Sequence, residues 1–279
     1  MKIQHILQSA SDKLKAAGCE DSLWQVKVLA AHLFGCSPGN VTLSILDEKI
    51  DIVFMEMFNT LLQKLINGIP LQYVIEEWDF FGRTFKVDSR ALIPRPETEL
   101  LIEFILKQNI PADSSILDVG TGSGIIGLTL AKELPDSLVI GIDISHAALT
   151  LVQENKRLLQ IQNYFPLQCN ILQSVKGKFN LIVANLPYIP TADLVTLDSI
   201  VINNDPVLAL DGGDTGITLI TRLINSARNH IYSGGLVVLE TGYDQAKSVS
   251  NLFLNEFWHK AVCYNDLAGK HRMVTAIRR

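Results

Sequence analysis

Cysteine is scarce in this sequence, and the few cysteines are far apart. The four of them form no Cys-x-x-Cys pair: they are Cys19, Cys36, Cys169 and Cys263. A disulfide framework or a zinc site would need cysteines at short, repeated spacings. We therefore expect reduced cysteines and no metal site.

Long apolar runs and a basic surplus are missing as well. No hydrophobic stretch approaches the roughly 20 residues that cross a bilayer. The charged residues Asp12, Lys13 and Lys15 do not fit the apolar core of a signal peptide. We expect a soluble, cytoplasmic protein with no membrane partner. The formal net charge of −5 argues against a stable nucleic acid partner, because phosphate contacts need a surplus of Lys and Arg.

The first 70 residues carry apolar side chains at helical spacing. Two stripes show this period, one from Ile3 to Leu14 and one from Phe54 to Leu65. An Asn-Gly pair and a proline then end the second stripe. Nothing in these stripes indicates chemistry, and we predict a small helical domain over residues 1–70.

The hydrophobic period changes after residue 70. Phe80 and Phe85 lie on either side of a turn at Gly82, which predicts a β-hairpin, and we assign residues 71–93 as a hairpin linker. The segment Pro94–Glu99 (Pro-Arg-Pro-Glu-Thr-Glu) then breaks the chain again. From its residue types alone, this segment is a rigid linker that caps the next helix.

From residue 94 to residue 279, short apolar strands alternate with helical stretches. The predicted strands are Ile116–Val119, Leu138–Ile142, Phe179–Ala184 and Leu236–Glu240. Helical patterns run between them, as from Ala147 to Leu159. Such alternation predicts an α/β fold with a doubly wound, Rossmann-like parallel sheet and helices on both faces.

A glycine-rich loop lies where the first strand turns into the first helix. Its residues are Gly120, Thr121, Gly122, Ser123 and Gly124. Glycine allows a sharp turn and a close approach of a ligand, and free N–H groups at a helix start favour a negative group. That group is the methionine carboxylate of a methyl donor or the pyrophosphate of a dinucleotide, and the glycines do not decide between them.

Asp143 ends the second strand, about twenty residues after the loop, where a carboxylate can hold ribose hydroxyls. The alternative interpretation is an N-cap for the following helix. The position at a strand end favours ribose binding.

The segment Asn185–Tyr188 (Asn-Leu-Pro-Tyr) follows the third predicted strand, at the edge where sites gather in doubly wound sheets. Pro187 forces Leu186 toward an extended conformation, so that the Leu186 carbonyl can point toward a ligand. The Asn185 side chain adds a second acceptor, and the Tyr188 ring offers a stacking face. Two fixed acceptors can hold both hydrogens of a planar –NH2 group.

Such a grip suits methylation of an amide or exocyclic nitrogen, whose lone pair is delocalised. Hydrogen bonds from the nitrogen to fixed oxygens favour a pyramidal geometry and stabilise the growing positive charge. No general base is needed before transfer. As a bare tetrapeptide, the segment is equally typical of an ordinary strand-to-loop turn, but the glycine loop and Asp143 favour the functional interpretation.

Taken together, the motifs resemble those of the HemK/PrmC-type release-factor glutamine methyltransferases over nearly the whole chain. The most specific of them is the Pro94–Glu99 run. The others are Pro70–Tyr73, Phe80–Gly82, the glycine loop, Asp143, the Asn-x-Pro-Tyr segment, Ala209–Gly213 and Asp266–Gly269.

The resemblance implies a class I methyltransferase that uses S-adenosylmethionine and releases S-adenosylhomocysteine. The implied reaction is N5-methylation of the glutamine in the Gly-Gly-Gln loop of class 1 peptide chain release factors. It implies that residues 94–279 form the methyltransferase domain and that residues 1–70 recognise the substrate.

The resemblance also assigns residues to the site. Cofactor contacts fall on Gly120, Thr121, Gly122, Ser123, Gly124, Asp143, Asn170 and Asn185. Glutamine binding falls on Asn185, Leu186, Pro187 and Tyr188, of which Asn185, Pro187 and Tyr188 are catalytic.

Two positions depart from the family pattern. Leu186 replaces the first of two prolines, and the resulting Asn-Leu-Pro-Tyr form also occurs in ribosomal RNA adenine dimethylases. RNA adenine N6-methylation is therefore the alternative function, against which stand the acidic balance and residues 70–99. Asn170 replaces an acidic residue beside the adenine, where its carbonyl oxygen can still accept one hydrogen bond.

The residues alone leave two further classes of protein function open. A nicotinamide-dependent oxidoreductase would use Gly122, Gly124 and Gly127 but leaves the Asn185–Tyr188 segment unexplained. A binding module without catalysis is indicated only if Leu186 disturbs the grip on nitrogen.

Overall fold

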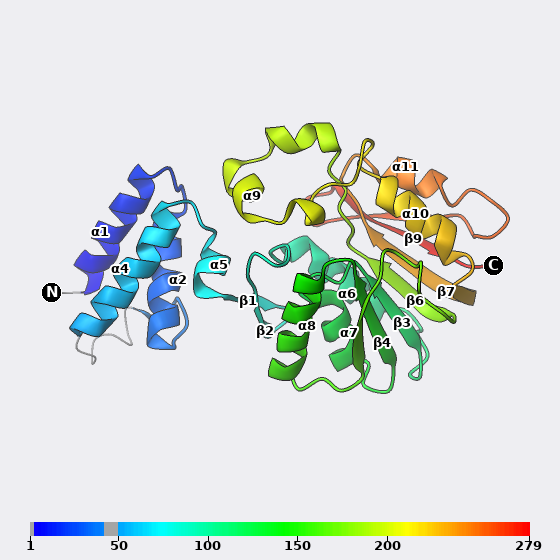
Figure 1. The fold of residues 1–279 in the computed structure, drawn as a ribbon, viewed down its shortest axis with the longest axis horizontal. Coiled ribbons are helices and arrows are strands. Elements are labelled where there is room, and N and C mark those ends of the chain that lie inside the picture. Colours follow the sequence, from blue (N-terminus) through cyan, green and yellow to red (C-terminus); the bar gives the residue numbers. More distant parts are fainter. Residues whose placement is uncertain (1–2, 42–49) are drawn as a thin grey trace. The chain divides into compact units, whose positions relative to one another are not determined.

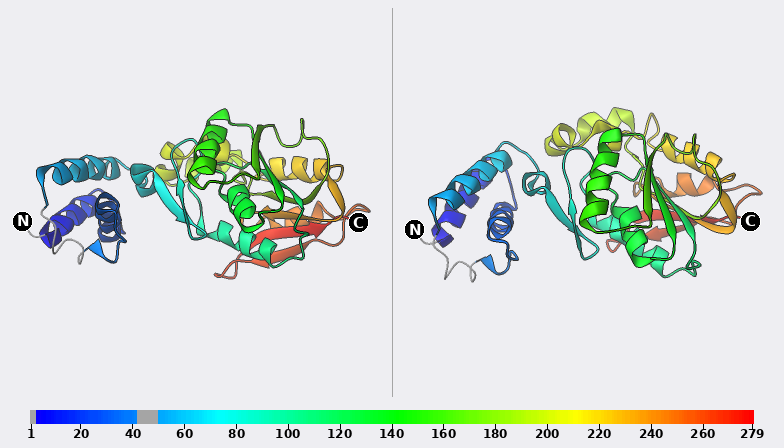
Figure 2. Two further views of the ribbon diagram at one scale, coloured as in Figure 1. Left: turned by 90° about the horizontal axis from the view of Figure 1, so that it is seen from below. Right: turned by 60° about the horizontal axis from the view of Figure 1, so that its bottom comes forward.

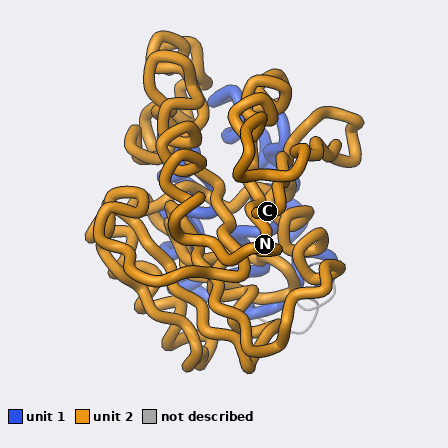
Figure 3. Tube along the Cα trace, turned by 90° about the vertical axis from the view of Figure 1, so that its right-hand side faces the viewer, with its two compact units in different colours: residues 1–77 blue, residues 78–279 orange. Residues whose placement is uncertain are grey.

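The computed structural model describes residues 3–41 and 50–279, so that residues 1–2 and 42–49 of the predicted N-terminal domain lie outside the described residues. The chain divides into two compact units, residues 1–77 and 78–279 (Figure 3). Within the described ranges, no helix has the length and apolar character needed to span a bilayer.

Unit 1 is built from helices, and the apolar stripes predicted those of residues 1–70. The helices are α1 (Ile3–Ala16), α2 (Ser22–Phe34), α4 (Ile52–Ile66) and α5 (Leu71–Ile75). α5 lies in the segment predicted as a hairpin linker, so the hairpin begins only after it. The first three lie side by side (Figures 1 and 2). Leu14, Leu29 and Leu62 are almost fully buried, because each occupies the inward stripe of its helix.

The predicted hairpin consists of β1 (Glu77–Phe80) and β2 (Arg83–Lys86). Its two-residue turn, Phe81-Gly82, has φ angles of 49° and 69°, and positive angles at both positions match the twist of hairpin strands. Glycine adopts this geometry freely, whereas Phe81 is held in it because its N–H donates to the Glu99 carboxylate at 2.9 Å. The turn is thereby tied to the end of the Pro94–Glu99 segment.

Unit 2 is centred on a seven-stranded sheet of order β5-β4-β3-β6-β7-β9-β8 (Figure 1). Its strands are β3 (Ser115–Val119), β4 (Leu138–Asp143), β5 (Tyr164–Gln168), β6 (Phe179–Ala184), β7 (Ile231–Glu240), β8 (Val262–Asn265) and β9 (His271–Ile277). The strands from β5 to β7 are parallel, and β9 runs antiparallel to both β7 and β8. The predicted doubly wound sheet is confirmed, with an antiparallel edge added.

Helices cover both faces of this sheet (Figure 2). One face packs against α6 (Glu99–Leu106), α7 (Ile125–Glu133) and α8 (His146–Leu158), and the other against α10 (Thr218–Ala227) and α11 (Ala246–Asn251). In β6, Leu181 and Val183 join the first core, whereas Ile182 and Ala184 join the second. A strand buried on both faces reads as a continuous apolar run, which is why this strand could be predicted.

The connection from β6 to α10 contains three short helices, η2 (Thr191–Thr196), α9 (Ser199–Asn204) and η3 (Val207–Ala209). β3 lies between β4 and β6, because the chain builds the sheet outward from β3 through β4 to β5 and then returns past β3 to β6 on its other side. Ligand sites of doubly wound sheets form at the carboxyl ends of the strands at such a switch point.

Gly141 in β4 leaves the space that Tyr164 of β5 fills. A Cβ at this position would lie 1.6 Å from the Tyr164 hydroxyl oxygen, and Tyr164 is fully buried. We expect Gly141→Ala to lower the free energy of unfolding by about 2 kcal/mol or more, as overpacking a core does. Urea denaturation followed by circular dichroism measures this change. Gly39→Ala is the control, because a Cβ there meets nothing within 4 Å; equal stability of the two variants would contradict the expectation.

Candidate active site

A cavity of about 230 Å³ opens at the carboxyl ends of β3, β4 and β6. Five residues predicted to contact a cofactor line it: Gly120, Gly122, Asp143, Asn170 and Asn185. The other three belong to the glycine loop but do not line the cavity. Thr121 and Ser123 are buried, and Gly124 is the N-cap of α7.

The glycine loop turns sharply between β3 and α7. Gly120, Gly122 and Gly124 have φ angles of 72°, 56° and 85°, in the left-handed region that favours glycine. The N–H groups of Gly120 and Thr121 donate to the Ile142 carbonyl at 2.8 and 2.9 Å. The end of β4 therefore fixes the start of the loop.

Asp118 in β3 is fully buried beneath this loop. Its Oδ2 accepts hydrogen bonds from the Thr121 hydroxyl at 2.5 Å and from the Gly127 N–H at 3.0 Å. The Thr121 hydroxyl also lies 2.8 Å from the Tyr164 hydroxyl, so the Thr121 side chain supports the loop from beneath. Burial raises the pKa of Asp118 to about 7, although the hydrogen bonds from Thr121 and Gly127 act to lower it.

Asp143 holds two neighbouring segments together at the rim of the cavity. Its carboxylate oxygens accept from the N–H groups of Gly122 and Ser145, each at 2.9 Å. The N-cap of α8 is Ser145, whose side chain accepts from the Ala148 N–H at 3.2 Å. Burial raises the pKa of Asp143, while the backbone N–H groups act to lower it. Each oxygen keeps a further lone pair for a ligand in the cavity.

Asn170 lines the cavity next to Arg222, a positively charged side chain that was not predicted from the sequence. Its Oδ1 accepts from the Arg222 Nη2 of α10 at 3.2 Å. A carbonyl oxygen has two lone pairs, so this contact leaves one acceptor position. The following residue, Ile171, has a φ of 52°, an unfavourable value for a β-branched residue and one typical of functional sites.

A second cavity of about 220 Å³ adjoins the first. The segment Asn185–Pro187 lines both cavities. Tyr188, Arg95 and Glu240 are among the other residues of the second cavity. Ligands bound in the two cavities would therefore meet at Asn185–Pro187.

The two predicted acceptors belong to this shared wall. Asn185 Nδ2 donates to the Thr98 hydroxyl oxygen at 3.2 Å, which leaves Asn185 Oδ1 as an acceptor. In the chain as described, from 3 to 41 and from 50 to 279, no hydrogen bond reaches the Leu186 carbonyl. The Leu186 side chain is buried, and a Cβ on Gly120 would lie 2.8 Å from its Cδ2. Replacement of proline by leucine therefore affects packing beneath the glycine loop and leaves the carbonyl available.

Contacts beyond Pro187 hold the end of the segment. The Tyr188 carbonyl accepts from Gln245 Nε2 at 2.7 Å, and a Cβ on Gly216 would lie 2.5 Å from the same carbonyl oxygen. Ile189 exchanges backbone hydrogen bonds with residues 210–212, and Gly212 allows this close approach because a Cβ there would lie 2.8 Å from the Tyr188 Cα. Burial raises the pKa of Tyr188 to about 12, so its phenol stays neutral and is no base near neutral pH.

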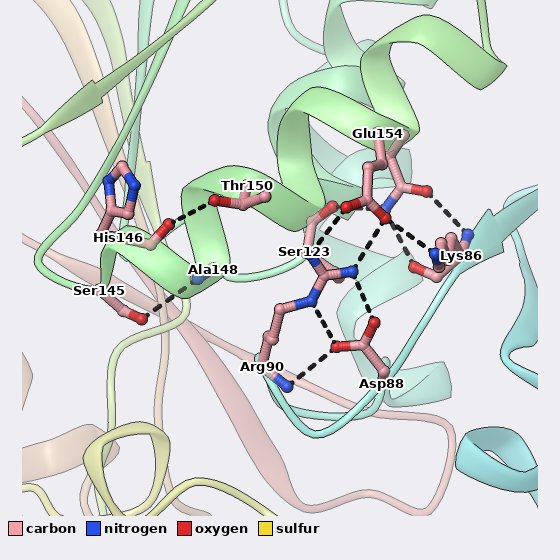
Figure 4. A network of polar contacts seen from close by, with 10 residues as sticks. Lys86, Asp88, Arg90, Ser123, Ser145, His146, Ala148, Thr150 and Glu154 are labelled. Atoms are coloured by element: carbon pink, nitrogen blue, oxygen red, sulfur yellow. Dashed lines mark hydrogen bonds and ion pairs between the residues drawn. The ribbon is translucent and has the colours of Figure 1, made fainter.

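Arg90 is another residue of the first cavity that sequence reasoning missed. Its guanidinium donates to Asp88 at 2.6 Å and to Glu154 of α8 at 2.8 Å, and Lys86 also pairs with Glu154 (Figure 4). These pairs fix the loop after β2 against α8. Because Arg90 and Glu154 are 64 positions apart, no local pattern could indicate their contact. Thr98, by contrast, lay within the Pro94–Glu99 motif, which carried a signal.

Comparisons with known proteins match both units. Residues 5–75 match the PrmC N-terminal domain family, and residues 95–197 match the Methyltransferase small domain family. The Release factor glutamine methyltransferase of Moorella thermoacetica is 37% identical over 285 residues, covering 100% of this chain and 99% of that protein. The protein of the same name from Streptococcus pneumoniae is 39% identical over 213 residues, 76% of each chain.

A solved structure shares the fold. The crystal structure of a methyltransferase from Pyrococcus furiosus superposes with a TM-score of 0.53, at 16% identity, over 71% of this chain and 89% of that one. At this identity the likeness shows the fold alone, and it supports the doubly wound arrangement of unit 2.

Asp118 should make stability depend on pH. Its pKa is raised from the usual 3.8 to about 7, so its contribution to stability is present below the unfolded-state pKa and is lost as pH rises through about 7. Relative to Asp118→Asn, the wild type should lose up to about 4 kcal/mol of unfolding free energy between pH 4 and pH 8. Urea denaturation of both proteins across this range measures the difference, and a difference independent of pH would show the expectation to be wrong.

Proposed function

This chain belongs to the release factor glutamine methyltransferase family, and on that premise we propose that it methylates the side-chain amide nitrogen (N5) of a glutamine. The target is the glutamine of the Gly-Gly-Gln loop in class 1 peptide chain release factors, and the methyl donor is S-adenosylmethionine. The observation that carries the proposal is the segment Asn185–Pro187, which lines both cavities and offers two unused acceptors.

The first cavity suits S-adenosylmethionine. Gly120 and Gly122 bring bare backbone to its wall, where a methionine carboxylate can approach the N–H groups at the start of α7. Asp143 offers lone pairs to ribose hydroxyls, and Ile171 and Leu219 give the apolar surface that an adenine ring needs. Asn170 can accept from the adenine amino group. The bound cofactor supplies a methyl group on a positively charged sulfur.

The second cavity suits the glutamine side chain. Asn185 Oδ1 and the Leu186 carbonyl accept the two hydrogens of its –NH2 group, and Tyr188 stacks on the amide plane. This grip turns the nitrogen lone pair out of conjugation and stabilises the positive charge that develops on nitrogen. With Tyr188 neutral near physiological pH, the proton leaves the nitrogen after methyl transfer rather than before it.

We also propose roles for the rest of the chain. The helical residues 1–70 recognise the release factor, the hairpin of residues 71–93 links them to the catalytic residues 94–279, and the protein acts in the cytoplasm, where its substrate acts. The likeness of residues 5–75 to the PrmC N-terminal domain supports a dedicated role for this part of the chain.

A labelling experiment tests the substrate. Purified protein with S-adenosylmethionine labelled in the methyl group should label a class 1 release factor, and Gln→Ala in its Gly-Gly-Gln loop should abolish the label. Mass spectrometry should place the added methyl on the glutamine side chain. Label on ribosomal RNA, with none on the release factor, would support the RNA alternative instead.

The acceptor role of Asn185 gives a second test. Asn185→Ala should lower kcat about 100-fold or more, the cost of losing one preorganised polar partner in a transition state. The circular dichroism spectrum should stay unchanged, since Asn185 lies after the end of β6. Asn229→Ala, at an exposed position on the protein surface, is the control. An Asn185→Ala enzyme with nearly full activity would refute the grip.

A further inference from the structure

A buried chain of polar groups ends at Asn185. Thr98 in η1 (Pro96–Thr98) is fully buried, and Glu240, the last residue of β7, is 2% exposed. The Thr98 hydroxyl donates to Glu240 Oε2 at 2.8 Å, and Asn185 Nδ2 donates to the Thr98 oxygen at 3.2 Å. Since the three residues come from separate elements, only the folded unit assembles this chain.

The chemistry of the three groups fixes the direction of each hydrogen bond. An ionised carboxylate only accepts, a hydroxyl has a single hydrogen, and a carboxamide has one donating end and one accepting end. Because Thr98 gives its hydrogen to Glu240, its oxygen can only accept from Asn185. The opposite orientation of the Asn185 amide would put its oxygen against an oxygen that has no hydrogen left to give.

Resting on the function proposed above, we propose that Thr98 and Glu240 are positioning residues that keep the Asn185 oxygen directed at the substrate amide. The two ends of a carboxamide have nearly the same size, so packing alone does not choose between them and the hydrogen-bond partners do. A reversed Asn185 would present –NH2 to the –NH2 of the glutamine, and neither group could accept from the other.

Burying a carboxylate such as Glu240 costs more free energy than a purely structural hydrogen bond would justify. Among the residues that the structure describes, no ion pair reaches it, and Arg272, whose charge acts on it, pairs with Asp266 at 3.1 Å. Burial raises the pKa of Glu240 to about 7, although hydrogen bonds from the side chains of Thr98 and Asn185 act to lower it. A buried charge without an ion pair reduces stability. While it is ionised, however, Glu240 only accepts and cannot return a hydrogen to Thr98, which the orientation of Asn185 requires.

Substitutions at Thr98 test the positioning role. Thr98→Val removes the hydroxyl at nearly constant volume, and Thr98→Ser keeps it. We expect Thr98→Val to lower kcat for the release factor about 100-fold, the usual effect of a misplaced catalytic group. The KM for the release factor and the dissociation constant for S-adenosylmethionine should stay unchanged, and Thr98→Ser should recover most of the activity.

Thr129→Val is the matched control for these variants. Thr129 in α7 is fully buried, and its hydroxyl has no hydrogen-bond partner within the described chain. Wild-type kcat in Thr98→Val, or an equal loss in Thr129→Val, would overturn the positioning role. A wild-type enzyme that does not methylate the release factor would count against the proposed function instead.

A pH profile tests the same idea without a destabilising change. The charged groups that act on Glu240 are Arg272 of β9 and Glu97 of η1, and the neutral Tyr188 lies beside it. Protonated Glu240 can give its own hydrogen to Thr98, which frees the hydroxyl to turn toward either end of Asn185. Wild-type kcat should therefore fall as the pH drops through about 7 and level off at a lower rate in acid. Glu240→Gln should be slower and lack this dependence, and identical profiles would contradict the proposal.

Discussion

The parallel register of β3 and β6 is the constraint on which the candidate site depends. Val119 pairs with Ala184, so Gly120 and Asn185 leave the sheet side by side. The missing Cβ of Gly120 then lets Leu186 pack against the glycine loop, and one segment becomes the wall of two cavities. A register shift by one residue would turn the side chains of β6 to the opposite face of the sheet and separate the loop from its partner.

Two buried carboxylates lower the stability of the folded state. Asp118 and Glu240 both have a pKa raised to about 7 by burial, so each costs free energy when it ionises. Asp118 supports the glycine loop, and Glu240 ends the polar chain that reaches Asn185. Ile171 adds an unfavourable backbone angle at the same cavity. Groups with strongly shifted pKa values and residues with unfavourable backbone angles collect at functional sites. There the charges and the geometry are held as function needs them, at a cost in stability.

Local pattern predicted the buried centre of the sheet but not its edges. β3, β4 and β6 were predicted because both of their faces are covered, which makes their sequences apolar throughout. The edge strand β5 gives no such signal: it contains Pro166, and Phe165 and Leu167 are about half exposed. Its strand conformation comes from pairing with β4, and such pairing depends on tertiary neighbours rather than on intrinsic preference. The edge strand β8 is likewise partly exposed (Val262 is 48% exposed), whereas β9 is an interior strand that was also missed although Met273–Ala276 are buried.

By itself, the sequence determined the sharp turns of the glycine loop and supplied the carbonyl oxygens of Asn185 and Leu186. Glycine acts on its own backbone and proline on the residue before it, so both effects lie within one or two positions. Only the tertiary structure decided which end of the Asn185 amide is held by Thr98 and which end is left as a free acceptor. That choice depends on Thr98 and Glu240, which are 142 positions apart, and a hydrogen bond takes its direction from the neighbour in space. No spacing in the sequence records such a neighbour.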